Sequence, residues 1–163
     1  MAAAAAALVV FGAAVAGFLL VVRGDRSLAD GIDLFRAGRY STAAEAFERV
    51  LERDPERVTA LLYLGRIERR RQAYADAAER LRTAARLAPD DPDVHRELGH
   101  LFLDLGRAES AVARFELALE VEPDAAANWI GLVRALRAAR DPHAEAVLRR
   151  APPEVRAVLA SGE

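Results

Sequence analysis

The sequence predicts an all-α fold, a solenoid of stacked helix–turn–helix units, because one pattern recurs in it at a fixed period. Gly31, Gly65 and Gly99 are evenly spaced, at a period of about 34 residues. The same spacing relates three further sets of positions: Ala43, Ala77 and Ala111; Phe47, Leu81 and Phe115; and Pro55, Pro89 and Pro123. A period of this length is typical of helical repeat arrays, whereas a bundle without repeats would not require identical spacing.

Size and charge allow a modest helical domain and exclude several classes of function. The chain has 163 residues, of which 53% are hydrophobic and only 6% aromatic; much of the apolar content is alanine, which favours helices. The formal net charge of −2 argues against a general nucleic-acid binder. Because the chain has no cysteine, it has no disulfide framework and no thiol chemistry.

The first element along the chain is an apolar segment, residues 2–22, which has no charged side chain and is followed by Arg23. About 20 apolar residues suffice for a helix to cross a bilayer, so we expect a transmembrane anchor and a single-pass membrane protein. A cleaved signal peptide is the main alternative, although the segment lacks a basic n-region.

Two further expectations concern this segment. Arginines on its C-terminal flank favour a cytoplasmic domain under the positive-inside rule, with a periplasmic domain as the alternative. Its small residues Gly12, Ala13, Ala16 and Gly17 give two pairs four positions apart, as at sites where helices pack in lipid. An alanine-rich segment also produces such spacings by chance.

The first three units follow one another in order. In the first, Leu28, Ile32 and Phe35 form the apolar stripe of a helix that ends at Gly38. Its second helix ends before Pro55, because the residue before a proline disfavours the helical conformation. The second and third units repeat this pattern up to Pro89 and Pro123.

A fourth unit begins well and then departs from the pattern. Val133 occupies the position of the repeated glycine, and Pro152 and Pro153 shorten the second helix. Terminal repeats of a solenoid are commonly atypical because they cap the stack. We therefore expect a solenoid over residues 24–151, with three clear repeats and one degenerate capping repeat, and a C-terminal capping segment over residues 152–163.

The residues at these positions resemble the tetratricopeptide repeat, in particular its membrane-anchored bacterial type. That family's unit carries Leu-Gly, an aromatic residue, Gly-x-Tyr, Ala, a second aromatic residue, Ala and Pro. The matching residues in the second and third units are Leu64, Gly65, Tyr74, Ala77, Leu81, Ala84 and Pro89, then Leu98, Gly99, Phe102, Gly106, Ala111, Phe115, Ala118 and Pro123. The resemblance covers about residues 24–151 and implies a protein-binding scaffold or adaptor.

Catalytic motifs are missing from the sequence. His95 and His100 are five positions apart on one expected helix and do not share a face, so they do not form a metal site. The sequence has no Gly-rich phosphate loop, no G-x-S-x-G motif and no cysteine nucleophile. We expect a protein that is not an enzyme and that uses no metal, cofactor or small-molecule substrate.

The resemblance also implies where a partner would bind, because the first helices of successive tetratricopeptide units line a concave groove. The expected partner-binding residues are Leu62, Arg66, Arg69, Arg70, Arg96, His100, Leu103, Ile130, Arg134 and Arg137. Guanidinium groups bind carboxylates and stack on apolar surfaces, so the expected partner is an acidic or amphipathic protein segment. The alternative is a solvated face whose arginines have local partners on the same helix.

Anchor and groove together predict a membrane-anchored interaction module that helps to assemble a membrane or envelope complex. The alternative is a structural subunit of a larger membrane complex, in which the transmembrane helix packs against its neighbours and the repeats act as a spacer.

Overall fold

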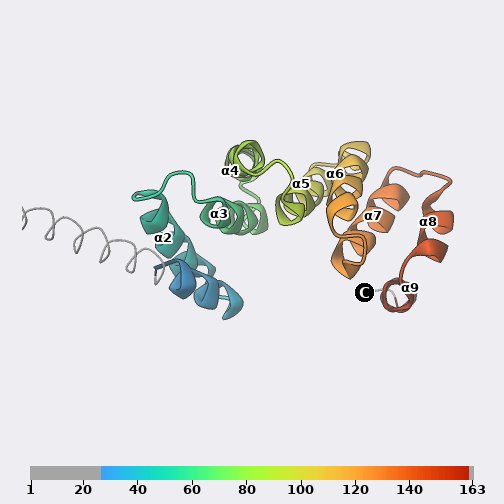
Figure 1. The fold of residues 1–163 in the computed structure, drawn as a ribbon, viewed down its shortest axis with the longest axis horizontal. Helices are drawn as coiled ribbons and strands as arrows, with labels where there is room; N and C mark the ends of the chain where they lie inside the picture. Colours follow the sequence, from blue (N-terminus) through green and yellow to red (C-terminus); the bar gives the residue numbers. More distant parts are fainter. Residues whose placement is uncertain (1–26, 162–163) are drawn as a thin grey trace, which may run out of the picture. The chain divides into compact units, whose positions relative to one another are not determined.

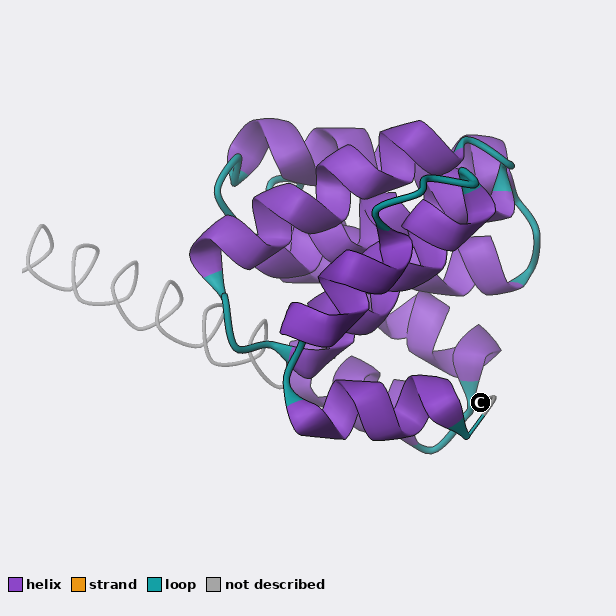
Figure 2. Ribbon diagram, turned by 90° about the vertical axis from the view of Figure 1, so that its right-hand side faces the viewer, coloured by secondary structure: helices purple, strands orange, loops and turns teal. Residues whose placement is uncertain are grey.

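The computed structural model describes residues 27–161, and this part of the chain consists of helices joined by short loops (Figure 2). A first helix covers residues 27–36. The helices labelled in Figure 1 are α2 (Tyr40–Leu51), α3 (Val58–Arg70), α4 (Tyr74–Leu87), α5 (Pro92–Asp104), α6 (Ala108–Val121), α7 (Ala126–Ala138), α8 (Ala144–Arg150) and α9 (Pro153–Ala160). The predicted all-α class is confirmed.

The chain divides into two compact units, and the first contains residues up to Tyr63. In its described part, the first helix packs closely on α2, because a Cβ added to Gly31 would lie 2.7 Å from Cε1 of Phe47. The Phe47 ring is fully buried and stacks on Tyr63 with the ring centroids 5.1 Å apart. Glycine at position 31 therefore makes room for the aromatic ring sixteen positions later.

The second unit begins at Leu64, within α3, and contains helices α4–α9. Within it, α4 packs on α5, α5 on α6, α6 on α7 and α7 on α8 (Figure 1). The close approach of glycine to a large side chain recurs in this unit. A Cβ on Gly65 would lie 2.7 Å from Leu81, and one on Gly99 would lie 2.8 Å from Phe115. The period in the sequence thus marks a repeated contact between paired helices.

The turn inside each helix pair is a second repeated feature. Positions 38, 72, 106 and 140 follow one another at the repeat period, and all four have a positive φ. Gly38 and Gly106 have φ values of 74° and 70°, which glycine adopts without steric cost. Gln72 and Arg140 have φ values of 62° and 56°, where a side chain is strained. The turn geometry therefore persists in the units that lack the glycine.

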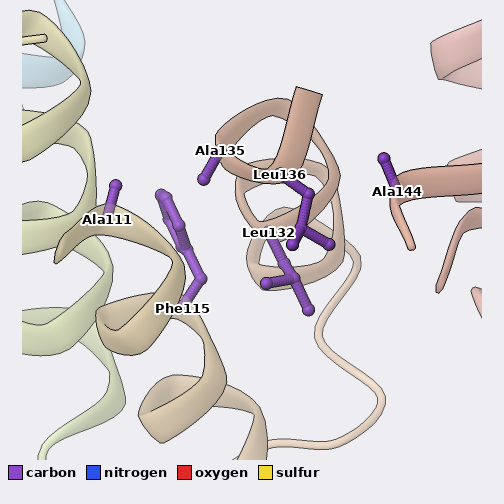
Figure 3. Packing of buried hydrophobic residues seen from close by; sticks show 6 residues of the cluster. All are labelled: Ala111, Phe115, Leu132, Ala135, Leu136 and Ala144. Carbon is purple, nitrogen blue, oxygen red and sulfur yellow. The ribbon is translucent and has the colours of Figure 1, made fainter. Parts of the chain in front are cut away.

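The fourth repeat lies at the C-terminal end of the second compact unit and ends in two short helices. α8 has 7 residues and ends before Pro152, and α9 begins at Pro153 and packs on both α7 and α8. Val133 is fully buried in place of the repeated glycine. The Phe115 ring from α6 points toward α7, where Ala135, Leu132 and Leu136 form one buried cluster with it (Figure 3).

The predicted localisation in a membrane is contradicted. Helices α2–α9 have 7 to 14 residues, so none of them is longer than about 21 Å, whereas a bilayer core is about 30 Å thick. Within residues 27–161, no helix is long and apolar enough to cross a membrane. The expected anchor over residues 2–22, with its packing residues Gly12, Ala13, Ala16 and Gly17, lies outside the described residues.

Candidate functional site

Helices α3 and α5 bring three of the predicted arginines to one place. Arg66 and Arg69 lie one turn apart at the C-terminal end of α3, and Arg96 lies on α5. Between them is the carboxylate of Glu97. Its Oε1 accepts from Nε of Arg66 at 2.9 Å, and its Oε2 lies 3.7 Å from Nη2 of Arg69. We call Arg66, Arg69 and Arg96 the arginine cluster.

Glu97 is the buried centre of this cluster. Its side chain is only 2% exposed, and its Oε2 has no hydrogen-bond partner within the described part of the chain. Burial raises the pKa of the Glu97 carboxyl, and the nearby charges of Arg66, Arg69 and Arg96 act in the opposite direction. The guanidinium neighbours are therefore what favours the ionised form of this buried carboxyl group, and the loss of one of them would leave the carboxylate with less compensation.

Three polar side chains orient the arginines from the other side. Nη1 of Arg69 donates to Oδ2 of Asp104 at 2.7 Å. Arg96 donates through Nη2 to Asp93 and through Nη1 to the buried Asn128 on α7, the latter at 3.4 Å. These contacts fix the guanidinium groups but leave them partly accessible to solvent. The side chains of Arg66, Arg69 and Arg96 are 27%, 19% and 17% exposed.

His100 lies next to this cluster and is held in its neutral form. Its ring meets Phe115 edge-on with the centroids 5.1 Å apart. Burial, together with the positive charges of Arg69 and Arg96, lowers the pKa of His100 to about 4. At neutral pH the imidazole is therefore an uncharged part of the surface, not a cation added to the arginines.

The other predicted groove residues differ in their accessibility. Leu62 is buried, and Leu103 and Ile130 are half-buried. Arg70 and Arg134 are exposed. Arg137 is exposed and pairs with Glu145 through Nη2 at 2.9 Å. The structure thus brings Arg66, Arg69, Arg96 and His100 together, while Leu62 belongs to the hydrophobic core.

Two residues of the site were not predicted from the sequence. Glu97 and Asn128 are both buried polar residues that contact the arginines. A signal for Glu97 was present, because it lies three and four positions from the buried Val94 and Leu101 and so shares their face of α5. An ionisable residue on an apolar helix face indicates a charged partner from another helix.

The remaining histidines, His95 and His143, make hydrogen bonds to neighbouring parts of the chain. His95 is buried, and its Nε2 donates to the carbonyl oxygen of Pro89 at 2.7 Å, where the preceding loop enters α5. His143 is exposed and bonds through Nδ1 to Asp141. Across residues 27–161, no group of three or more His, Asp or Glu side chains is placed to hold a metal ion.

Comparison with family models decides the classification of this fold. One model described as a tetratricopeptide repeat matches residues 28–92, and a second with the same description matches residues 68–136. Together the two matches cover more than half of the chain. The chain belongs to the tetratricopeptide repeat family. The predicted resemblance and the helical solenoid class are confirmed, and the comparisons give no support for a membrane-anchored type.

Individual tetratricopeptide proteins show the same relationship. A TPR repeat-containing protein of Treponema pallidum is 36% identical over 84 residues, which are 52% of this chain and 10% of that protein. This chain thus spans about a tenth of the length of the curated relative that it matches. A thermophilic TPR protein of Thermus thermophilus is 25% identical, with 85% of this chain and 80% of that chain aligned at a TM-score of 0.74.

An enzyme is also among the similar structures. An O-GlcNAc transferase mutant from Thermobaculum terrenum is 30% identical with a TM-score of 0.68, over 69% of this chain and 22% of that chain. The tetratricopeptide fold itself is generally a non-catalytic fold for protein interaction, and proteins that contain it bind peptides or other proteins.

Proposed function

We propose that this chain is a protein-interaction module that binds an acidic or amphipathic peptide segment of a partner through the arginine cluster, together with the exposed Arg70 of α3 and Arg134 of α7. Membership of the tetratricopeptide family supports the binding of a protein or peptide. The observation that carries the acidic preference is the cluster itself, in which three partly exposed guanidinium groups surround one buried carboxylate. In this proposal, α9 serves as the end cap of the array.

The internal ion pairs favour binding because they pre-organise the arginines. An isolated arginine loses rotamer freedom when it binds a carboxylate, which costs about 0.5–1.5 kcal/mol for each immobilised side chain. In Arg69 and Arg96 the contacts with Glu97, Asp104, Asp93 and Asn128 already fix the side chains. Each guanidinium group has five N–H donors. Arg69 donates to Asp104, and Arg96 donates to Asp93 and Asn128, which leaves donors for an external carboxylate.

The neutral His100 and the half-buried Leu103 supply a less polar part of the same surface. A partner segment that combines carboxylates with apolar side chains would bind both parts. This combination distinguishes an amphipathic peptide from a free anion, which would use the arginines alone.

The experiment is selection from a random peptide library on the full chain, followed by fluorescence anisotropy with the selected peptides. We expect the selected peptides to be rich in Asp and Glu and to bind more weakly as salt is raised. The test variant reverses the charge of Arg70 and Arg134, both of which are exposed. Its expected effect is a loss of affinity of about tenfold or more, or at least about 1.4 kcal/mol.

A matched control reverses Arg149 and Arg150, which are exposed at the end of α8, and changes the net charge of the chain by the same amount. This control variant should keep the wild-type affinity. Equal losses in the two variants would mean that only the overall charge matters. Selection of neutral or basic peptides would refute the proposed acidic preference.

A further inference from the structure

A second surface of the molecule carries arginines of a different kind. A cleft of about 630 Å³ lies over α5 between α4 and α6, the helices that flank α5 in Figure 1. Its floor includes Leu98, Leu101 and Phe102, and Leu105 at its edge is 40% exposed. None of its lining residues belongs to the arginine cluster. The volume is within the range of about 300–1,000 Å³ that is usual for binding sites.

Four arginines surround this apolar floor: Arg82, Arg86, Arg107 and Arg114. The guanidinium group of Arg86 donates to the hydroxyl of Thr83 at 3.1 Å. Within residues 27–161, none of the four pairs with a carboxylate, in contrast to the arginine cluster. Glu79 is the acidic residue of the lining. The cleft therefore has an excess of positive charge that the described part of the chain does not neutralise.

The exposed face of α6 carries the opposite charge. Glu116 and Glu120 lie one turn apart on this helix, and next to them Leu117 and Val121 are 37% and 50% exposed. At 100° per residue these four residues fall within an arc of about 140°, and Ala111, Phe115 and Ala118 are buried on the opposite side. We call Glu116, Leu117, Glu120 and Val121 the α6 face.

The repeat register relates this surface directly to α4. Positions 82, 86 and 87 become 116, 120 and 121 when the chain is shifted by one repeat period. We call the corresponding residues Arg82, Arg86 and Leu87 the α4 face. This face has two arginines where the α6 face has two glutamates, and each face keeps an exposed apolar residue, Leu87 or Val121. Equivalent faces of consecutive units therefore have similar shapes and opposite charges.

Each face is unfavourable when it is alone in solvent. Like charges one turn apart on a helix repel each other, as Arg82 does Arg86 and Glu116 does Glu120. Neither glutamate pairs with a basic residue among those that the structure describes. Opposing the two faces would relieve both repulsions and would cover Leu87, Leu117 and Val121.

We propose that a second copy of this chain occupies this surface, with the α4 face of one copy against the α6 face of the other. Since each copy carries both faces, a two-fold axis would form the contact twice, as in isologous dimers. Arg114 links the cleft to the contact, because it lines the cleft and lies seven positions before Val121 on the same side of α6. This inference goes beyond the proposed peptide binding and uses none of its residues.

The experiment measures the dimer dissociation constant of the full chain by sedimentation velocity, in low and in high salt. One variant carries Arg82→Glu and Arg86→Glu, and a second carries Glu116→Arg and Glu120→Arg. All four residues are exposed, so both variants should keep the wild-type helicity. We expect each variant alone to dimerise at least about tenfold more weakly than the wild type. High salt should weaken the wild-type dimer.

Mixing the two variants is the decisive measurement. The first variant has two acidic faces and the second has two basic faces, so together they restore both contacts. We expect a 1:1 heterodimer in native mass spectrometry with an affinity close to that of the wild-type dimer. Association through any other segment of the chain would not follow this exchange of charges. The control variant, Arg149→Glu with Arg150→Glu, should dimerise as the wild type does.

A wild-type chain that stays monomeric over the whole concentration range would overturn the proposal. So would reversed variants that associate as strongly as the wild type, or a mixture without heterodimers. Peptide binding at the arginine cluster is measured independently, so failure of one proposal is distinguishable from failure of the other.

Discussion

Substituting Gly131 by alanine tests the close packing of α7 against Phe115 of α6. A Cβ at this position would lie 2.2 Å from Cε1 of Phe115 and 2.5 Å from Cδ1 and Cζ. Ordinary contacts are 3.4 Å or longer, so the ring would have to move by about 1 Å. It has no room on its other side, because Gly99 is in similarly close contact with it and the ring is fully buried.

The expected effect is the difference between two contributions. Overpacking of a well-packed core costs about 1–3 kcal/mol, while replacing glycine by alanine inside a helix gains about 1 kcal/mol from helix propensity. Because the added methyl group would lie only 2.2 Å from the confined ring, the cost is in the upper part of that range, about 2–3 kcal/mol. We therefore expect Gly131→Ala to lower the free energy of unfolding by about 1–2 kcal/mol. For a chain of this size that corresponds to a fall of about 2–8 °C in the melting temperature followed by far-UV circular dichroism.

A double-mutant cycle with Phe115→Leu isolates the contact. In the leucine background the smaller side chain leaves space for the new methyl group, so Gly131→Ala should cost less than in the wild type. An increase in melting temperature on Gly131→Ala would show that propensity outweighs packing. An equal cost in both backgrounds would show that the ring of Phe115 is not the residue against which the methyl group clashes.

Three further outcomes follow from the structure. Gln72→Gly should raise the free energy of unfolding by up to about 1 kcal/mol, because it removes a side chain from a positive φ, whereas Arg71→Gly should lower it; urea denaturation measures both. His100 should titrate at about pH 4 by NMR. Folding lowers the pKa of His100 from its usual value of 6.5, so the neutral imidazole stabilises the fold above pH 6.5, and this contribution is lost as the pH falls toward 4. His100→Gln should remove this dependence. Arg66→Ala should lower the free energy of unfolding by roughly 1–3 kcal/mol, because Glu97 stays buried with one ion-pair partner fewer. Arg70→Ala should lower the free energy of unfolding by much less.

The fold was predictable because the repeat pattern reports packing contacts within each helix pair. Close contacts join residues only sixteen positions apart, Gly65 with Leu81 and Gly99 with Phe115. Both members of each contact therefore lie within one repeat, and the contact recurs in the sequence at the repeat period. The contact between Phe115 and Gly131 was not predicted. It joins one unit to the next, and the repeated glycine position in the fourth unit is Val133.

The site was less predictable because its contacts cross between helices of different units. The helical positions of the arginines suggest a common surface, but they do not reveal that Arg66 pairs with Glu97 and Arg69 with Asp104, each on the first helix of the following repeat. No local spacing rule identifies such pairs. Burial is likewise not a local property: Leu62, which the repeat register assigns to the binding surface, is only 5% exposed because neighbouring helices cover it.

One position of the repeat explains why the arginine cluster lies where it does. Positions 63, 97 and 131 are equivalent in the repeat register. Tyr63 stacks on Phe47, and Gly131 contacts Phe115, so in these two units the position is used for packing against a phenylalanine. In the unit between them, the residue equivalent to both phenylalanines is a leucine, and Glu97 replaces the packing residue. A buried carboxylate needs positive partners, so this one exchange requires the arginines on α3 and turns a structural position into the centre of a charged surface.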